Sequence, residues 1–257
     1  KKCVYEVRYI KKGAVAMRFV EGKGTMNRVV VGTLHFYHRP SVKPGESSSH
    51  QSVWGEQRRF HDAVERSIIE LRYLEERASD QVDAQTGSIF AVHAMLLEDE
   101  EFVRTVDRLI RTEKLTAERA VWKVAISYVE QFNDLEDPYM RARASDIQDV
   151  FSRVLRKLTG STWQLDVNSP VILVSDSLFP SEVMEASHQK VLGIVSRNDN
   201  VGSHSAMLLN GYRIPSVAQA DIPSEWEGRT VLMDSGTGRI YLEPNLEMIS
   251  ALVPQYA

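Results

Sequence analysis

A histidine flanked by small polar residues stands in the stretch 200–207, Asn-Val-Gly-Ser-His-Ser-Ala-Met. Gly202 and Ser203 precede His204 and Ser205 follows it, where the pattern predicts the start of a helix. The first amides of a helix have no intrahelical acceptor and its dipole favours negative charge, so a phosphoryl group on this imidazole would meet N–H donors. Neutral imidazole is also a competent nucleophile near neutral pH. The stretch therefore suits phosphoryl chemistry, although a histidine at a helix start is more often a cap or a surface residue.

The elements that would position this histidine alternate between strand and helix. Buried-strand runs, short helices and turn residues follow one another from about residue 160 onward. The last two strands flank a turn at 234–238, which predicts a hairpin. The predicted strands are 171–174, 191–195, 214–218, 230–233 and 239–242, and the predicted helices are 180–189 and 203–209. Such alternation is typical of an α/β domain.

The N-terminal segment also favours strands. Apolar and aromatic residues alternate from Cys3 to Tyr9, which is strand spacing, and 29–34 is a second β-rich run. The polar stretch 40–52, rich in serine, proline and glycine, has the composition of a linker.

The middle of the chain carries a helical pattern instead. Apolar residues recur at spacings of three and four, or close to them, from Trp54 to Leu74, which predicts one face of a long helix. Thr116 is a predicted N-cap, and Asp137 followed by proline predicts the start of a helix that runs to Gly160. Four or five helices joined by short connections predict a helical bundle.

Composition narrows the classes of function. The 257 residues carry a formal net charge of -4 without a basic stripe, so no nucleic-acid partner is expected. No apolar run approaches the roughly 20 residues that cross a bilayer, so no membrane contact is expected. The basic N-terminus is not followed by an apolar run, so no signal peptide is predicted. The single Cys3 excludes an internal disulfide framework, and together these features favour the cytoplasm.

The sequence predicts neither a metal site nor a nucleotide site in this chain. No histidines and carboxylates fall at the spacing of a helical metal motif such as H-E-x-x-H. No glycine-rich Walker-type loop is present. His93 lies within an apolar helical stretch and is expected to be structural.

Two stretches of the C-terminal half resemble a known signature. Residues 202–206 followed by 214–217 resemble the phosphohistidine signature shared by Enzyme I, pyruvate phosphate dikinase and phosphoenolpyruvate synthase. The turn at 233–238 resembles the closing hairpin of the same swivelling domain.

The helical region distinguishes between these families. Residues 88–101 and 142–158 are similar to the HPr-docking region of Enzyme I, an insertion that the dikinases lack. The resemblance runs in order from about residue 20 to residue 248. It favours the N-terminal half of Enzyme I of the phosphoenolpyruvate-dependent sugar phosphotransferase system, or a close Enzyme I-like paralogue.

The resemblance implies a fold of the α/β plus all-α class. A swivelling phosphohistidine α/β domain would comprise residues 1–45 and 160–250, with a helical HPr-binding bundle, residues 50–159, inserted in it. The implied activity is that of a phosphoenolpyruvate-protein phosphotransferase, in which His204 relays the phosphoryl group to HPr or an HPr-like protein. The residues implied near the active site are Gly202, Ser203 and Ser205, and those implied to dock HPr are Leu96, Asp99, Glu100, Glu101 and Arg143.

The resemblance also limits what this chain would do alone. In the family, phosphoenolpyruvate phosphorylates the histidine through a separate C-terminal barrel domain that needs magnesium. No such barrel is recognisable in this sequence. We therefore expect no cofactor in this chain, and no use of phosphoenolpyruvate without the barrel domain.

The neighbourhood of His204 departs from the family pattern. The family has a glycine pair, a basic residue and a threonine before its Ser-His, and residues 199–202 are Asp-Asn-Val-Gly here. An arginine of the family is replaced by Asn210, and a threonine that contacts the active histidine aligns with Phe179. A family glycine after the following strand aligns with Gln219. These changes remove a cationic phosphate partner and limit how the loop can wrap an anion.

Two interpretations follow from these departures. The first is a divergent Enzyme I that still transfers phosphoryl groups through His204. A variant of it is the Enzyme I-like domain of a dihydroxyacetone kinase phosphoryl donor. The second is a degenerate paralogue that keeps the docking fold but binds or regulates without transfer. The retained Ser203-His204-Ser205 favours transfer.

Overall fold

The computed structural model describes residues 18–40, 44, 52–161, 165 and 167–252. These residues form two compact units. The described residues of Lys1–Arg39, Leu165–Leu178 and Glu182–Ala257 make an α/β unit, and those of Pro40–Gln164 and Phe179–Ser181 make a helical unit. The strand predicted from Cys3 to Tyr9 and most of the predicted linker lie outside the described residues.

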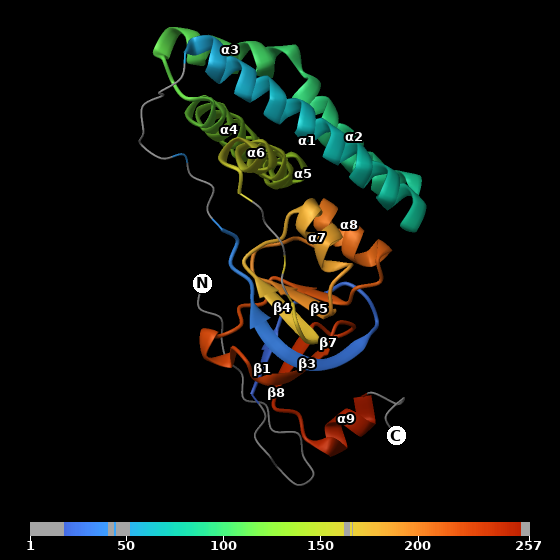
Figure 1. Cartoon of the computed structure of the whole chain (residues 1–257). Coiled ribbons are helices and arrows are strands. Elements are labelled where there is room, and N and C mark those ends of the chain that lie inside the picture. The colour runs from blue at the N-terminus through green and yellow to red at the C-terminus, as the bar shows by residue number, and fades with distance from the viewer. Residues whose placement is uncertain (1–17, 41–43, 45–51, 162–164, 166, 253–257) are drawn as a thin grey trace. The chain divides into compact units, whose positions relative to one another are not determined.

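The α/β unit is built on one eight-stranded sheet in the order β1-β8-β7-β3-β4-β5-β6-β2 (Figure 1). Strands β3 to β6 run parallel, and all other neighbours in the sheet are antiparallel. The strands are β1 (Phe19–Glu21), β2 (Lys23–Gly24), β3 (Val29–Phe36), β4 (Val171–Ser175), β5 (Val191–Ser196), β6 (Ser216–Ala218), β7 (Thr230–Asp234) and β8 (Arg239–Leu242). The predicted strands of the C-terminal half are confirmed, as is the hairpin of β7 and β8.

The sheet curls until its two outermost strands meet. Only Gly22 separates β1 from β2, yet these strands lie at opposite ends of the strand order. Consecutive Cα atoms are about 3.8 Å apart, so the two edges of the sheet must lie side by side. The Gly22 amide donates to the Gly238 carbonyl oxygen at 2.8 Å. A Cβ on Gly22 would lie 2.5 Å from the Ala218 carbonyl oxygen, and one on Gly24 would lie 1.9 Å from that of Ser235. Glycine is needed at both positions because the backbones approach so closely.

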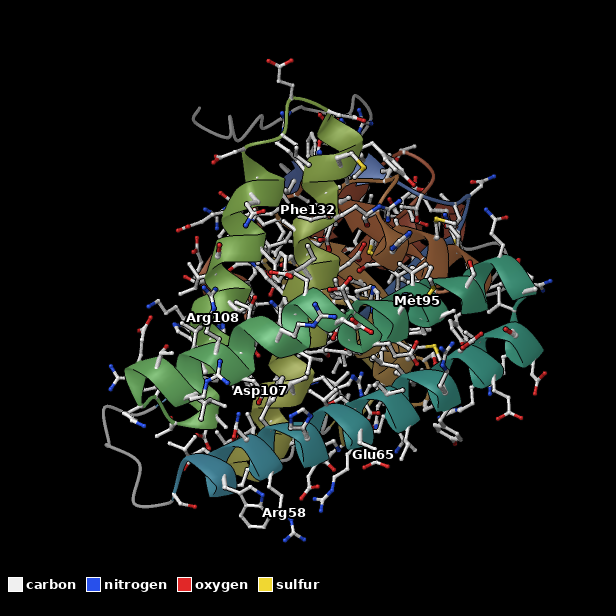
Figure 2. All side chains as sticks on the ribbon, turned by 90° about the horizontal axis from the view of Figure 1, so that it is seen from above. Arg58, Glu65, Met95, Asp107, Arg108 and Phe132 are labelled. Carbon is white, nitrogen blue, oxygen red and sulfur yellow. The ribbon has the colours of Figure 1, made fainter. Side chains whose placement is uncertain are left out.

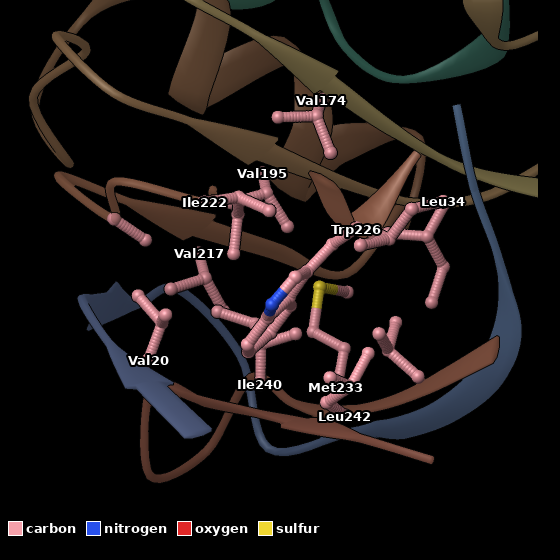
Figure 3. Close-up of a cluster of buried hydrophobic side chains, with 13 residues drawn as sticks. Val20, Leu34, Val174, Val195, Val217, Ile222, Trp226, Met233, Ile240 and Leu242 are labelled. Carbon is pink, nitrogen blue, oxygen red and sulfur yellow. The ribbon is translucent and has the colours of Figure 1, made fainter. Parts of the chain in front are cut away.

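A hydrophobic core fills the inside of this curled sheet (Figure 3). Alternate residues of the strands point into it, and Trp226 from the loop before β7 is its largest side chain. Its members are Val20, Leu34, Ile172, Val174, Val195, Val217, Ala220, Ile222, Trp226, Val231, Met233, Ile240 and Leu242. Loops and helices follow the carboxyl ends of the parallel strands, outside this core.

Three helices follow strands of the α/β sheet. α7 (Pro180–Ala186) comes after β4, and α8 (His204–Gly211) comes after β5. Both therefore begin near the carboxyl ends of parallel strands, where α/β proteins commonly bind ligands. α9 (Leu246–Leu252) follows β8, and its apolar residues pack against Leu232 and Tyr241.

The helical unit contains six helices among its described residues (Figure 1). They are α1 (Val53–Gln81), α2 (Ala84–Glu98), α3 (Glu100–Glu113), α4 (Ala117–Asn133), α5 (Pro138–Ala142) and α6 (Ala144–Thr159). The Thr116 hydroxyl caps α4, and Gly160 ends α6 with φ of 66°, as predicted. The helix opened by Asp137 was expected to run on to Gly160, but it stops at Ala142 and α6 begins after Arg143. None of the described helices is both long enough and apolar enough to cross a bilayer.

Aromatic rings from three helices form part of the helical core. The ring centroids of Phe60 and Phe102 are 5.7 Å apart, and those of Phe102 and Phe151 are 5.1 Å apart. The prediction that Trp54 shares this inward face is wrong, because its side chain is 67% exposed. Trp54 lies six residues before Phe60, which is about 1.7 helical turns and therefore a different face. Glu56, one turn before Phe60, is 2% exposed and accepts the Ala117 amide at 2.9 Å.

Candidate functional site

His204 and the three residues predicted to lie near it, Gly202, Ser203 and Ser205, are found at the start of α8. The Ser203 hydroxyl accepts the Ala206 amide at 3.1 Å, which is an N-cap contact, and His204 is the first residue of the helix. The Ser203 amide donates to the Asn200 carbonyl oxygen at 3.0 Å, which folds the preceding loop into a turn. Gly202 lies in that turn and Ser205 follows His204. A helix start of this kind is a general anion site.

The backbone of Leu178 holds the His204 loop on both sides. The Ser205 hydroxyl donates to the Leu178 carbonyl oxygen at 2.5 Å. The Leu178 amide donates to the Asp199 carboxylate at 3.1 Å. Leu178, in the loop after β4, therefore binds Asp199 before the histidine and Ser205 after it.

A buried ion pair supports the same end of the α/β unit. The Glu182 side chain is 1% exposed and accepts from Nε and Nη2 of Arg39, both at 2.6 Å. The Tyr37 hydroxyl donates to the same carboxylate at 2.8 Å. Arg39 also donates to the Ser177 carbonyl oxygen at 3.0 Å. The bidentate geometry and the third donor satisfy a carboxylate that would otherwise be costly to bury.

Burial raises the pKa of Asp199 to about 6. The negative charge of Glu182 acts in the same direction. Hydrogen bonds from the Leu178 amide and the Ser196 side chain, with the positive charge of Arg39, lower the pKa but do not cancel the effect of burial. Asp199 is therefore ionised above about pH 6 and protonated below it.

Two departures from the family pattern are joined by a hydrogen bond. Gln219, which aligns with a family glycine, has φ of 58°, a left-handed conformation that favours glycine. Its side-chain amide donates to the Asn200 side-chain oxygen at 2.7 Å. Val201, at the place of a family basic residue, is 45% exposed, and Asn210 is also exposed. The loop is therefore tied by side-chain amides where the family has glycine.

Four of the predicted docking residues lie at the junction of α2 and α3, namely Leu96, Asp99, Glu100 and Glu101. The fifth, Arg143, lies between α5 and α6. Leu96 is half-buried near the end of α2, and Asp99 caps α3 by accepting the amides of Glu101 and Phe102. Glu100 reaches solvent with its side chain 78% exposed. Burial raises the pKa of Tyr128, and the negative charges of Asp99 and Glu101 raise it further.

Arg143 is connected to α2 through one carboxylate. Its Nη1 lies 3.3 Å from Asp146 Oδ2, and its guanidinium stacks 4.3 Å from the centre of the Tyr139 ring. Asp146 Oδ1 lies 3.9 Å from Nε2 of His93 on α2. His93 is 3% exposed, as expected for a structural residue, and Arg143 is held within the bundle rather than extended into solvent.

Sequence reasoning missed an exposed apolar pair on α2. Val92 and Met95 are 59% and 62% exposed, and they lie three residues apart on one face of the helix. Met95 is labelled in Figure 2. α2 is apolar nearly all round, so its periodicity did not show which face is covered. The contacts of Arg39 with Glu182 were also missed, because the two residues are 143 positions apart.

Family models match both parts of the chain. The model described as PEP-utilising enzyme, N-terminal, matches residues 21–143, and the one described as PEP-utilising enzyme, mobile domain, matches residues 167–238. Both models describe parts of PEP-utilising enzymes, and together they match 195 (123 and 72) of the 257 residues. The second match contains the whole stretch around His204, and the first contains the α2–α3 junction.

Curated relatives agree with this family. The phosphoenolpyruvate-protein phosphotransferase of Staphylococcus carnosus is 30% identical over 216 residues, which are 81% of this chain and 38% of the relative. That of Bacillus subtilis is 27% identical over 241 residues, 91% of this chain and 41% of the relative. The chain thus spans about two fifths of the length of these PEP-utilising enzymes.

Solved structures confirm the fold class. A solution structure of Enzyme I has a TM-score of 0.70 at 26% identity, covering 92% of this chain and 97% of that one. An N-terminal domain of a nitrogen Enzyme 1 has a TM-score of 0.62 at 24% identity and supports the fold alone. The predicted resemblance to the N-terminal half of Enzyme I, and the α/β plus all-α class, are confirmed.

Proposed function

We propose that this chain carries a phosphoryl group on His204 and exchanges it with a histidine of HPr or an HPr-like protein. The observation that carries the proposal is the position of His204 as first residue of α8, behind the Ser203 cap. This position lies within the part of the chain that matches the mobile domain of PEP-utilising enzymes.

The proposed step is a transfer between two imidazoles. A ring nitrogen of His204 attacks the phosphorus of the partner's phosphohistidine, forming one P–N bond as the other breaks. Negative charge on the phosphoryl oxygens would be stabilised by the first amides and the dipole of α8. The reaction is reversible because a bond of the same type is made and broken. Use of phosphoenolpyruvate, and of magnesium with it, would need the barrel domain that the family resemblance implies.

HPr would dock at the junction of α2 and α3. The carboxylates of Glu100 and Glu101 are exposed there, and Leu96 with the exposed Met95 offers apolar contact. A partner with a basic rim around an apolar centre would be complementary to this surface. Charged groups at a rim mainly raise the rate of encounter and make it salt-dependent.

Labelled phospho-HPr tests the transfer directly. The wild-type chain should take up acid-labile label, and His204→Ala should take up none while it still binds HPr. Label retained by His204→Ala would move the site elsewhere. Absence of label on the wild type, despite measurable binding, would contradict transfer.

Charge reversal tests the docking surface separately. The pair Glu100→Lys and Glu101→Lys should weaken HPr binding by about tenfold or more at low salt, because each change replaces attraction with repulsion. Glu65→Lys is the matched control, since Glu65 is an exposed carboxylate on α1 (Figure 2). Equal loss in both would show a general effect of net charge and would contradict docking at α2–α3.

A second candidate is an HPr-binding module without transfer. Val201 and Asn210 favour it, because they replace the basic residues with which the family meets phosphate. Binding of HPr without acid-labile label would select this candidate. With either function we expect the protein to work in the cytoplasm, which remains a prediction from its composition.

A further inference from the structure

We propose that Ser205 is a positioning residue for His204: its buried hydroxyl fixes the first turn of α8 on the backbone of Leu178 and so sets the direction of the imidazole. The inference rests on the proposed transfer at His204 and adds a residue that acts through the histidine, not on the phosphoryl group. Ser205 comes directly after the histidine, is 3% exposed, and donates to the Leu178 carbonyl oxygen at 2.5 Å.

Ser205 is a polar member of the buried face of α8. Leu208 and Leu209, three and four residues after it, are also buried and lie on the same face of the helix. Contacts of such apolar side chains are non-directional, so they hold the helix on its neighbours without fixing its rotation. A hydrogen bond is directional, so Ser205 fixes the rotation one residue away from the half-buried His204.

The acceptor of this hydrogen bond belongs to a loop that is itself held in place. The Ser177 carbonyl oxygen accepts the Ser175 hydroxyl at 2.8 Å and Nη2 of Arg39 at 3.0 Å. Arg39 is held in turn by the buried carboxylate of Glu182, through two contacts of 2.6 Å. The backbone of Leu178 is therefore a fixed point of the α/β unit, and the hydrogen bond transmits its position to the start of α8.

The position of this turn matters for transfer because a nucleophile approaches phosphorus roughly in line with the bond that breaks. A misplacement of about 1 Å can slow an enzymatic step about a hundredfold. The rotamer of His204 depends on its backbone and on the side chains around it, so a turn that shifts also releases the ring. Ser203 caps the same turn, but its contact with the Ala206 amide lies within the helix. Ser205 supplies a contact between the helix and the rest of the unit.

The kinetic test compares Ser205→Ala with Ser67→Ala in the full chain. Ser205→Ala should lower the rate of transfer from saturating phospho-HPr about tenfold and change the half-saturating concentration less than about twofold, because the proposed docking surface lies on α2 and α3. Ser67→Ala is the matched control, since it removes another buried hydroxyl, which donates to the Ala63 carbonyl oxygen at 2.7 Å in the helical unit. It should leave both quantities unchanged. An unchanged rate in Ser205→Ala, or an equal loss in Ser67→Ala, would overturn the proposal.

A spectroscopic test works even without transfer. The NMR couplings between the Hα and Hβ atoms of His204 report how its side chain is distributed among staggered rotamers. They should show one rotamer in the wild type and in Ser67→Ala, and averaging over more than one in fully folded Ser205→Ala. If the wild type takes no label, the proposed function fails, while these couplings still decide whether Ser205 orients the histidine. Couplings that are the same in the wild type and in Ser205→Ala would overturn the positioning role.

Discussion

At the scale of single residues, the loops around His204 contain a partly buried carboxyl group and a strained backbone. Hydrogen bonds offset part of the free-energy cost of both. Asp199 has a raised pKa because it is partly buried, and Gln219 has a left-handed backbone. Each gives an acceptor or a donor to the loop before the histidine. Local strain and cost of this kind often accompany functional loops.

Asp199→Asn should stabilise the protein at neutral pH. A pKa of about 6 against an ordinary value of about 3.9 means that the folded state binds the proton more tightly than the unfolded state. The contribution of Asp199 to stability is therefore complete below about pH 4 and lost as the pH rises through about 6. We expect Asp199→Asn to raise the unfolding free energy by ~1–2 kcal/mol at pH 8 and by nearly nothing at pH 4. Chemical denaturation at both pH values measures this, and an equal change at both would contradict it.

Substitutions at Gln219 should have opposite signs. A left-handed backbone costs about 1 kcal/mol in a residue that carries a Cβ, and glycine avoids this cost. Gln219→Gly should therefore raise the unfolding free energy by roughly 0.5–1 kcal/mol. Gln219→Ala keeps the strain and loses the hydrogen bond to Asn200, so it should lower that free energy by about 0.5 kcal/mol. Thermal unfolding of the pair checks the prediction. Two substitutions that destabilise equally would show that backbone strain does not decide this position.

At the scale of elements, the junction of α2 and α3 divides its acidic residues between two tasks. Asp99 serves the backbone, since its carboxylate accepts two amides of α3. Glu100 and Glu101 come next in the first turn of α3, where the helix dipole favours negative charge, and they are exposed. The acidic run is therefore a helix cap followed by the charges that we propose for docking.

Asp99→Ala should destabilise the helical unit, whereas Glu100→Ala should not. Loss of an N-cap acceptor costs about 1 kcal/mol, because two amides of α3 lose their acceptor. Among the described residues, Glu100 pairs with Arg104 on the exposed surface of the same helix, and such pairs contribute a few tenths of a kcal/mol at most. Urea unfolding followed by helical circular dichroism measures both variants. A larger loss in Glu100→Ala would contradict this division of tasks.

At the scale of the whole molecule, the α/β unit depends on segments from both ends of the chain. β1 pairs with β8, so that Glu21 faces Arg239, and the two side chains are 2.7 Å apart. β3 lies between β7 and β4, both of which come after the helical segment in sequence. The helical unit lies between these segments in sequence and has its own aromatic core.

Closure of the sheet should fail if Gly24 gains a side chain. Its Cβ would lie 1.9 Å from the Ser235 carbonyl oxygen, so Gly24→Ala should separate the strands and lower the unfolding free energy by about 3 kcal/mol or more. Hydrogen exchange should show loss of protection in β6, β7 and β8, with the amides of α1 to α6 unchanged. Gly202→Ala is the matched control, because nothing lies within 4 Å of its Cβ. A tolerated Gly24→Ala would show that the strands can separate without cost.

Features whose partners are close along the chain could be predicted from the sequence alone. The caps at Thr116, Ser203 and Gly160, the hairpin before residue 242 and the start of α8 at His204 depend on contacts within about four residues. Local hydrogen bonds of this kind are encoded by neighbouring residue types. This was enough to find the histidine and the element that presents it.

The contacts that hold that histidine, and the faces of the helices that are covered, depend on tertiary contacts that no local pattern reveals. Leu178, Asp199 and Ser205 meet because β4 and β5 are adjacent in the sheet, and Arg39 reaches Glu182 across 143 positions. Residue type alone does not reveal such meetings, because they depend on the order in which strands pair. In the sequence, Asp199 stands where the family has glycine. Its contact with Leu178 follows only from the pairing of β4 with β5, which brings the two residues together.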